Sequence, residues 1–316
     1  MTKKIGRRGF LRDSLLASLS GTTWAFEEKA LLGAAVQSTS APQGNATSLP
    51  LGKIGKLSVS RLVCGGNLFS SFAHSRDLIY VSGLLKRYFS DEKVIETLAL
   101  CESQGINTAI LRVDEQIVRI LTAYRKHTGS KIQWIAQAKL PTKDPAADIK
   151  MAIDNGAVGV YLHGGVADEL VRKGRMDSIA KAVETIRSAG VLTGVAGHML
   201  EVPVACEKAH LDVDFYMKTL NSKSYWSAGP MPRHDSVWEE TPQETIAFMA
   251  TVQKPWIAYK VLGAGAIHPR EGFEYAFRNG ADFICVGMFD FQVAEDVTLA
   301  KTAVASAQQR PRIWSS

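Results

Sequence analysis

Short apolar runs alternate with longer stretches of helical periodicity from about residue 61 to the end of the chain. Each apolar run has the length of one strand, and its nearly continuous hydrophobicity is typical of a strand covered on both faces. The stretches between the runs carry apolar positions at the spacing of amphipathic helices. Strands are therefore predicted at 61–67, 107–113, 132–140, 158–163, 192–198, 213–219, 256–262 and 282–288.

Helices are predicted most clearly at 91–104, 115–127, 176–189 and 242–252. Asp91 and Thr241 suit helix N-caps, and glycines 105, 156, 190 and 280 stand where helices should end. Strand–helix units repeated over about 250 residues predict one (βα)8 barrel. A doubly wound open sheet is the alternative, but the turn after the first strand lacks the third glycine of a dinucleotide-binding fingerprint.

Polar residues follow or close every predicted strand, and in a (βα)8 barrel these carboxyl ends form the active-site mouth. We therefore predict a catalytic or binding mouth. Alternation along 213–219 predicts that Lys218 and Tyr216 point into the barrel, leaving Phe215 and Met217 for the helix layer. The strand-end residues are Asn67, Arg112, Lys139, His163, His198, Lys218, Lys260 and Asp290.

Lys218 and Lys260 end two neighbouring predicted strands of apolar sequence. Adjacent strands lie about 4.8 Å apart, so the two amines are expected to face each other in the mouth. Burial and a second cation both disfavour a protonated lysine, which would leave one amine neutral and nucleophilic. The alternative is that such a lysine only anchors an anion or forms an ion pair.

The first 35 residues have a different pattern. Ile5–Arg12 contains a twin arginine followed by Phe-Leu and a third arginine, which is typical of a Tat export signal. The apolar stretch after it is too short for a stable membrane span. Residues 36–49 are small and polar, as in a flexible linker, and 50–316 form the barrel domain. We therefore expect the Tat machinery as a partner and a periplasmic or otherwise exported location.

Composition narrows the classes of partner. The net charge is +6 over 316 residues, and no long Lys/Arg run occurs beyond the amino terminus, so nucleic acid is not expected as a partner. The four cysteines contain no CxxC pair, which argues against zinc knuckles and favours separate buried thiols.

Two long loops, 68–90 and 220–240, are expected above the mouth. The second contains Tyr225, Trp226 and Trp238, which suit stacking on a sugar ring or exclusion of water. A subunit contact or a small apolar cap is the alternative for these aromatic residues.

Gly263 and Gly265 follow the seventh predicted strand, where backbone N–H groups could bind a phosphate or carboxylate. A tight turn explains them equally well. His163 and His198, with Asp290 or Asn67, could bind a divalent metal, but the first strand argues against such a site because it ends without a His-x-His pair.

Three segments resemble aldo/keto reductases. Leu49–Asn67 resembles the opening hairpin and first strand of that family, Gly105–Asn107 the start of its second strand, and Gly287–Val297 its last strand and following helix. The resemblance runs from about residue 49 to 304 and implies a barrel fold, NADP(H) and a carbonyl substrate. The candidate cofactor contacts are Asn67, Gly263, Gly265 and Asp290.

The catalytic residues of that family are an aspartate, a tyrosine, a lysine and a histidine. Lys139 and His163 match the lysine and the histidine, while Ile110 stands where the family has its aspartate and the tyrosine is not matched. Tyr80 or Tyr88, after the first strand, could replace the missing acid.

The cofactor positions of that family also differ here. Ala196-Gly197 replaces the Ser-Asn pair that holds the nicotinamide amide. Met288-Phe289 stands where a basic residue would bind the extra phosphate.

Two further segments, Asp214–Thr219 and Tyr259–Ile267, resemble strands six and seven of deoxyribose-phosphate aldolase. In that family one lysine forms a Schiff base and the next lowers its pKa. The resemblance implies these roles for Lys218 and Lys260.

Three hypotheses follow for a small-molecule substrate. The first is an NADPH-linked reductase using Lys139 and His163 to polarise a carbonyl oxygen. The second is a redox-free lyase or aldolase with Lys218 as nucleophile, Lys260 beside it, and His163 or His198 as proton carrier. The third is a non-catalytic sugar-binding barrel. Arg112 and the loop aromatics are the candidate substrate contacts in each case.

Overall fold

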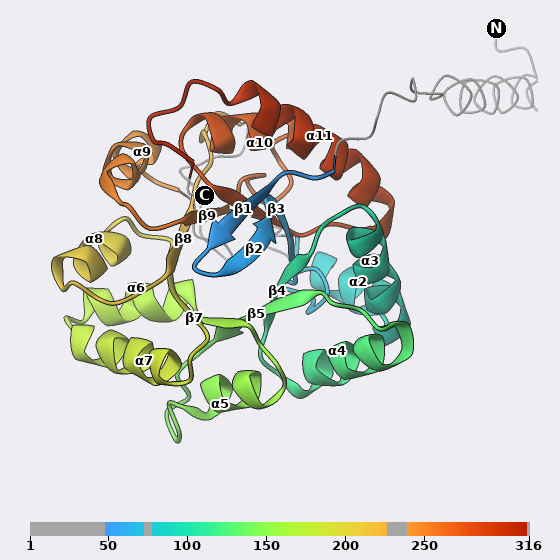
Figure 1. Ribbon diagram of the computed structural model, residues 1–316, viewed down its shortest axis with the longest axis horizontal. Coiled ribbons are helices and arrows are strands. Elements are labelled where there is room, and N and C mark those ends of the chain that lie inside the picture. The colour runs from blue at the N-terminus through green and yellow to red at the C-terminus, as the bar shows by residue number, and fades with distance from the viewer. Residues whose placement is uncertain (1–47, 73–77, 226–238, 315–316) are drawn as a thin grey trace, which may run out of the picture. The chain divides into compact units, whose positions relative to one another are not determined.

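A closed barrel of eight parallel strands forms the centre of the domain that begins at Ser48 (Figure 1). The computed structural model describes residues 48–72, 78–225 and 239–314. Each strand pairs with its sequence neighbour, and the last closes the ring on the first. The predicted (βα)8 barrel is therefore confirmed. Its strands are β3 (Leu62–Gly65), β4 (Thr108–Arg112), β5 (Gln133–Ala138), β6 (Gly159–Leu162), β7 (Leu192–Gly197), β8 (Phe215–Thr219), β9 (Trp256–Tyr259) and β10 (Phe283–Val286).

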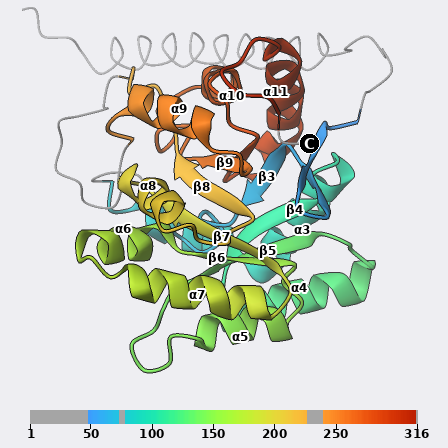
Figure 2. The same ribbon diagram turned by 60° about the vertical axis from the view of Figure 1, so that its left-hand side comes forward.

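Helices surround the barrel on its outside, as Figures 1 and 2 show from two directions. Within the described ranges no helix is long and apolar enough to cross a membrane. The Tat-type segment, 1–35, and nearly all of the linker lie outside the described residues. The helices are α2 (Val81–Tyr88), α3 (Asp91–Ser103), α4 (Glu115–Thr128), α5 (Ala147–Asp154), α6 (Gly164–Arg172), α7 (Met176–Ser188), α8 (Glu201–Lys208), α9 (Pro242–Thr251), α10 (Pro269–Arg278), the 3-10 turn η1 (Asp290–Gln292) and α11 (Val293–Ser306).

The first and last residues of the four helices predicted most clearly agree with the structure to within a residue or two. The N-cap of α3 is Ser90 rather than Asp91, because the serine hydroxyl accepts the Lys93 amide at 3.3 Å. All four predicted helix-ending glycines adopt left-handed φ angles between 72° and 104°. Glycine enters this conformation without a steric penalty, which explains the residue type at those positions.

A hairpin of β1 (Leu51–Ile54) and β2 (Leu57–Ser60) precedes the first barrel strand. Its buried residues Ile54 and Val59 pack into one cluster with inward side chains of the barrel, among them Val63 and Ile110. The hairpin thus fills the barrel interior at the amino-terminal ends of the strands. The polar residues at the carboxyl ends are left to form the mouth.

The predicted orientation of β8 is wrong. Phe215 and Met217 belong to the interior cluster, whereas Tyr216 packs with the outer cluster between strands and helices. Lys218, which alternates with Met217, therefore lies on the helix-facing side. Both residues donate hydrogen bonds to carboxylates in the outer layer. The Tyr216 hydroxyl donates to Glu207, and the Lys218 ammonium group donates to Glu239. These partners come from other segments, and the alternation within the strand does not reveal them.

Candidate active site

A histidine–aspartate pair occupies the mouth beyond β7. His198 follows the last residue of that strand, and its Nδ1 lies 2.7 Å from Oδ2 of Asp168, on α6. The other carboxylate oxygen of Asp168 accepts the backbone N–H groups of His198 at 3.0 Å and Met199 at 3.1 Å. Asp168 is 1% exposed, so the carboxylate is held by these bonds instead of by water.

This contact assigns the proton on the His198 ring. An ionised carboxylate only accepts hydrogen bonds, so Nδ1 must carry the hydrogen and Nε2 keeps a lone pair. Burial lowers the pKa of His198, the bond to Asp168 opposes this shift, and the nearby positive charge of Lys260 lowers the pKa further. A neutral imidazole with a free Nε2 is suited to accept a proton.

Tyr259 presents a hydroxyl beside this histidine. It is the last residue of β9 and packs with the interior cluster, and its ring centroid lies 5.4 Å from that of His198. Its hydroxyl is shielded from solvent and has no hydrogen-bond partner among the described residues. Burial raises the pKa of Tyr259 well above its ordinary value, so the phenol keeps its proton and can donate a hydrogen bond.

A glycine allows the two groups to approach the start of α6 closely. A Cβ atom at Gly164, the first residue of α6, would lie 2.7 Å from the Tyr259 hydroxyl and 3.2 Å from Cε1 of His198. Only the absence of a side chain at this position allows both rings to lie where they do.

Gly164→Ala is expected to reduce substrate turnover at least tenfold, because the added Cβ must displace the buried Tyr259 hydroxyl or the His198 ring. The same displacement is expected to lower the melting temperature. Gly165→Ala is the matched control, since its Cβ would approach only the edge of the neighbouring His163 ring, at 3.1 Å. Equal activity of the two variants would show that turnover does not depend on the positions of these two rings.

The two lysines occupy the same neighbourhood but have different environments. Lys260 follows β9 in a left-handed conformation, with φ 57°, and is partly buried. Lys218 is completely buried on the other side of β8, with its Nζ 2.5 Å from Glu239. Both charges act on His198. The two amines therefore lie near one histidine, yet Lys218 does not enter the mouth from the barrel interior.

His163 and Lys139 end neighbouring strands, as the sequence predicts. His163 is the N-cap of α6 and directly precedes Gly164, so it lies at the edge of the His198 site. Lys139 is exposed just beyond β5, where its backbone N–H donates to Asp148 at 2.8 Å. His163 thus remains beside the candidate site, whereas the Lys139 side chain extends into solvent.

Several predicted contact residues have local partners. Arg112 pairs with Asp114 at 2.6 Å and lies 4.8 Å above the Phe72 ring. Asp290 accepts the Tyr88 hydroxyl and pairs with Lys93 at 3.1 Å. Arg112 and Asp290 therefore each belong to an ion pair of their own.

The remaining predicted contacts are two glycines of a turn, Asn67, and two tryptophans outside the described residues. Gly263 and Gly265 are left-handed, and a Cβ at Gly263 would lie 3.1 Å from the ring of Tyr225. The turn is therefore tight and covered by this tyrosine. Asn67 is exposed, and its carbonyl accepts the amide of Phe72. The predictions for Trp226 and Trp238 lie outside the described residues.

The residues at the family's cofactor positions do not supply its usual contacts to NADP(H). A Cβ at Gly197 would lie 2.6 Å from Val202, so this position has no room for an amide-binding side chain. Beyond β10, Met288-Phe289 stands where that family has a basic residue for the extra phosphate. The described residues also contain no group of three His, Cys, Asp or Glu side chains arranged to hold a metal ion.

Sequence reasoning did not identify Asp168 or Tyr259 as site residues. Asp168 lies in the second turn of the helix after His163, a region that the strand-end rule does not cover. Tyr259 immediately precedes Lys260. Because consecutive side chains of a strand point to opposite faces, the prediction that Lys260 faces the barrel interior placed Tyr259 on the helix side. A signal for Tyr259 was present, because a tyrosine ending an otherwise apolar strand carries one polar group that requires a partner.

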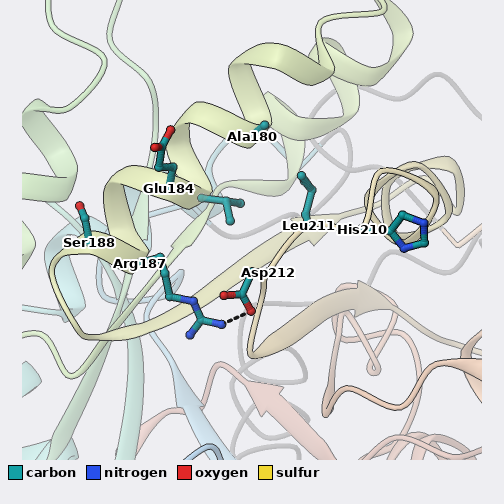
Figure 3. A pocket seen from close by; sticks show the side chains of 8 residues that line it. Ala180, Glu184, Arg187, Ser188, His210, Leu211 and Asp212 are labelled. Carbon is teal, nitrogen blue, oxygen red and sulfur yellow. Dashed lines mark hydrogen bonds and ion pairs between the residues drawn. The ribbon is translucent and has the colours of Figure 1, made fainter.

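A separate concavity of about 370 Å³ lies between α7 and the segment before β8 (Figure 3). Arg187 pairs there with Asp212, and with Asp214 at 2.9 Å. Both aspartates precede β8, so this concavity lies toward the amino-terminal ends of the strands, away from His198. Arg187 is thus paired with both aspartates, and we assign no chemistry to this concavity.

Comparisons with known proteins establish the fold. No protein-family model and no curated protein matches the chain. Two structures named as aldo-keto reductases from Pseudomonas aeruginosa are similar, with TM-scores of 0.58 and 0.57 and identities of 17% and 18%. They cover 82% and 81% of this chain, and 98% of each of those chains. Phospho-2-dehydro-3-deoxyheptonate aldolase from Thermotoga maritima has a TM-score of 0.52 at 9% identity, over 83% of this chain and 75% of that one. At these identities the likeness shows an aldo-keto reductase-like barrel and does not carry an activity with it.

Proposed function

We propose that the chain is an enzyme that transfers a proton at a carbonyl-bearing or carbohydrate-like small molecule, with His198 as the base. The single observation that carries the proposal is the arrangement of His198, Asp168 and Tyr259. Burial keeps the imidazole neutral and the phenol protonated. The lowered pKa of the imidazole suits it to act as a base, and the raised pKa of the phenol suits it to act as a hydrogen-bond donor.

The proposed step is enolisation. Nε2 of His198 removes a proton from the carbon next to the carbonyl, the electrons of that C–H bond form the C=C bond of an enolate, and the carbonyl π electrons move onto the oxygen. The carbonyl oxygen accepts a hydrogen bond from Tyr259, and the Lys260 charge nearby favours the negative oxygen. Asp168 stabilises the imidazolium that forms, which then returns the proton to the substrate. No Schiff base is included, because Lys218 is buried in the helix layer and gives hydrogen bonds to three oxygens.

NADPH-linked reduction of a carbonyl is the second candidate, because the barrel is similar to those of aldo-keto reductases. In that reaction NADPH would supply the hydride. Tyr259 and His198 would then bind the carbonyl oxygen and supply the proton.

The two candidates are separated by incubating the full chain in heavy water with dihydroxyacetone, pyruvate or a keto-sugar, with and without NADPH. We expect deuterium to appear at the carbon next to the carbonyl without NADPH consumption. NADPH oxidation with the same probes would support the reductase instead. Binding of the keto-sugar with neither reaction would favour the sugar-binding barrel and contradict both enzymatic proposals.

A further inference from the structure

A buried ion pair lies directly behind the proposed base. Lys218 is fully buried, and its partner Glu239 is 2% exposed. Taking two charges out of water is costly unless their remaining hydrogen bonds are satisfied. A buried pair of this kind is expected to have a structural or functional role. Its hydrogen bonds to neighbouring polar groups indicate what that role is.

All three ammonium protons of Lys218 have acceptors. Nζ donates to Glu239 at 2.5 Å, to the Thr219 hydroxyl oxygen at 2.8 Å and to the Thr219 carbonyl at 3.1 Å. The second oxygen of Glu239 accepts the Thr241 amide at 3.1 Å and the Thr245 hydroxyl at 3.2 Å. Burial lowers the pKa of Lys218, and the charge and hydrogen bond of Glu239 oppose this. With all three protons donated, the lysine serves as a fixed cation.

Thr219 links this pair to the candidate site. Its hydroxyl donates to the carbonyl oxygen of His198 at 3.0 Å while accepting from Lys218. On the other side, Asp168 holds the backbone N–H and the ring of the same histidine. His198 is therefore fixed at its carbonyl by one network and at its amide and ring by another.

We propose that Lys218, Glu239 and Thr219 are positioning residues, which hold His198 in the orientation that directs Nε2 into the mouth. This inference deepens the proposed function and rests on His198 being the proton carrier. It assigns the lysine a role different from that of a Schiff-base nucleophile. The cation acts through the threonine, without touching the reacting atoms.

The pair also acts electrostatically on His198. The charged or titratable groups that face this ring are Asp168 from α6, Lys218 from β8, and Tyr259 with Lys260 from β9 and its end. Lys218 lowers the pKa of His198, and Glu239 neutralises part of that charge through its direct contact. Removing Lys218 should therefore raise the pKa of His198.

The test is nuclear magnetic resonance of isotope-labelled histidine nitrogens in the full chain, with the His198 signals assigned by their absence in His198→Asn. Thr219→Val keeps the contact between Lys218 and Glu239 but removes the hydroxyl, which is both the donor to His198 and one of the three acceptors of Lys218. We expect it to add a second tautomer or to broaden the His198 signal, and we expect Thr219→Ser to restore the single tautomer. An unchanged signal in Thr219→Val would overturn the proposal.

Charge variants give a second, independent readout. Lys218→Gln is expected to raise the pKa of His198, because it removes a nearby cation. Glu207→Gln and Lys254→Gln, from the ion pair at 2.6 Å beside Tyr216, are controls expected to leave it unchanged. An unchanged or lowered pKa in Lys218→Gln, or an equal shift in the controls, would contradict the positioning role. The histidine signals test the positioning role, and deuterium exchange into the carbonyl probe tests the proposed function. Either result can be negative while the other is positive.

Discussion

Replacing His198 by asparagine is expected to reduce carbonyl-probe exchange by about 10²–10⁴-fold, the range that a general base contributes. Asparagine keeps a hydrogen bond to Asp168 but cannot take a proton at the position of Nε2. Asp168→Asn is expected to lower the rate as well, because an amide can donate to Nδ1 and stabilise the other tautomer. Rates are measured by the appearance of deuterium in the probe.

His210→Asn is the matched control, because His210 is exposed before β8 and lies outside the mouth. It should retain the rate of the unaltered chain. A His198→Asn variant that folds and still catalyses deuterium exchange into the carbonyl probe at the rate of the unaltered chain would contradict the assignment of the base.

The lowered pKa of His198 sets the expected pH dependence. The neutral base is present above its pKa in the folded protein, which lies below the ordinary value of 6.5. Activity should therefore persist below pH 6.5 and fall only as the folded pKa is reached. The unfolded chain binds this proton more readily, so the contribution of His198 to stability is present above pH 6.5 and is lost as the pH falls through the folded pKa.

Lys218→Met is expected to lower the free energy of unfolding by about 3–5 kcal/mol, because it leaves the Glu239 carboxylate buried without its counter-charge. Methionine fills most of the volume of the lysine stem, so a large cavity is not the cause. The double variant Lys218→Met with Glu239→Gln should recover much of this loss. Chemical denaturation, monitored by fluorescence, gives the free energies.

Lys254→Met provides the comparison, because its ion pair with Glu207 is partly exposed. Pairs of that kind contribute about 0–1 kcal/mol. If Lys218→Met cost no more than Lys254→Met, the Lys218–Glu239 contact would not be the strong buried pair described above.

The barrel could be predicted from the chain because its evidence is local. The apolar runs mark the strands, and glycines such as Gly105 and Gly190 end helices in a conformation that few other residues adopt. The position of His198 followed from the same pattern, since the residue after a barrel strand must lie at the mouth.

The partners of His198 could not be predicted in the same way. Asp168 is 30 residues away on another unit, and Glu239 is 21 residues from Lys218. The orientation of β8 depended on which layer offered carboxylates to Tyr216 and Lys218, and alternation alone fits either choice. These contacts depend on packing between units, which no local pattern encodes.

The protonation of the His198 ring is the most direct test of its role as the base. Isotope-labelled histidine nitrogens in the unaltered chain would be followed by nuclear magnetic resonance from neutral to acidic pH. We expect one neutral tautomer with the proton on Nδ1, and a pKa below 6.5. A ring that is protonated at neutral pH, or that carries its single proton on Nε2, could not serve as the base and would contradict the proposed function.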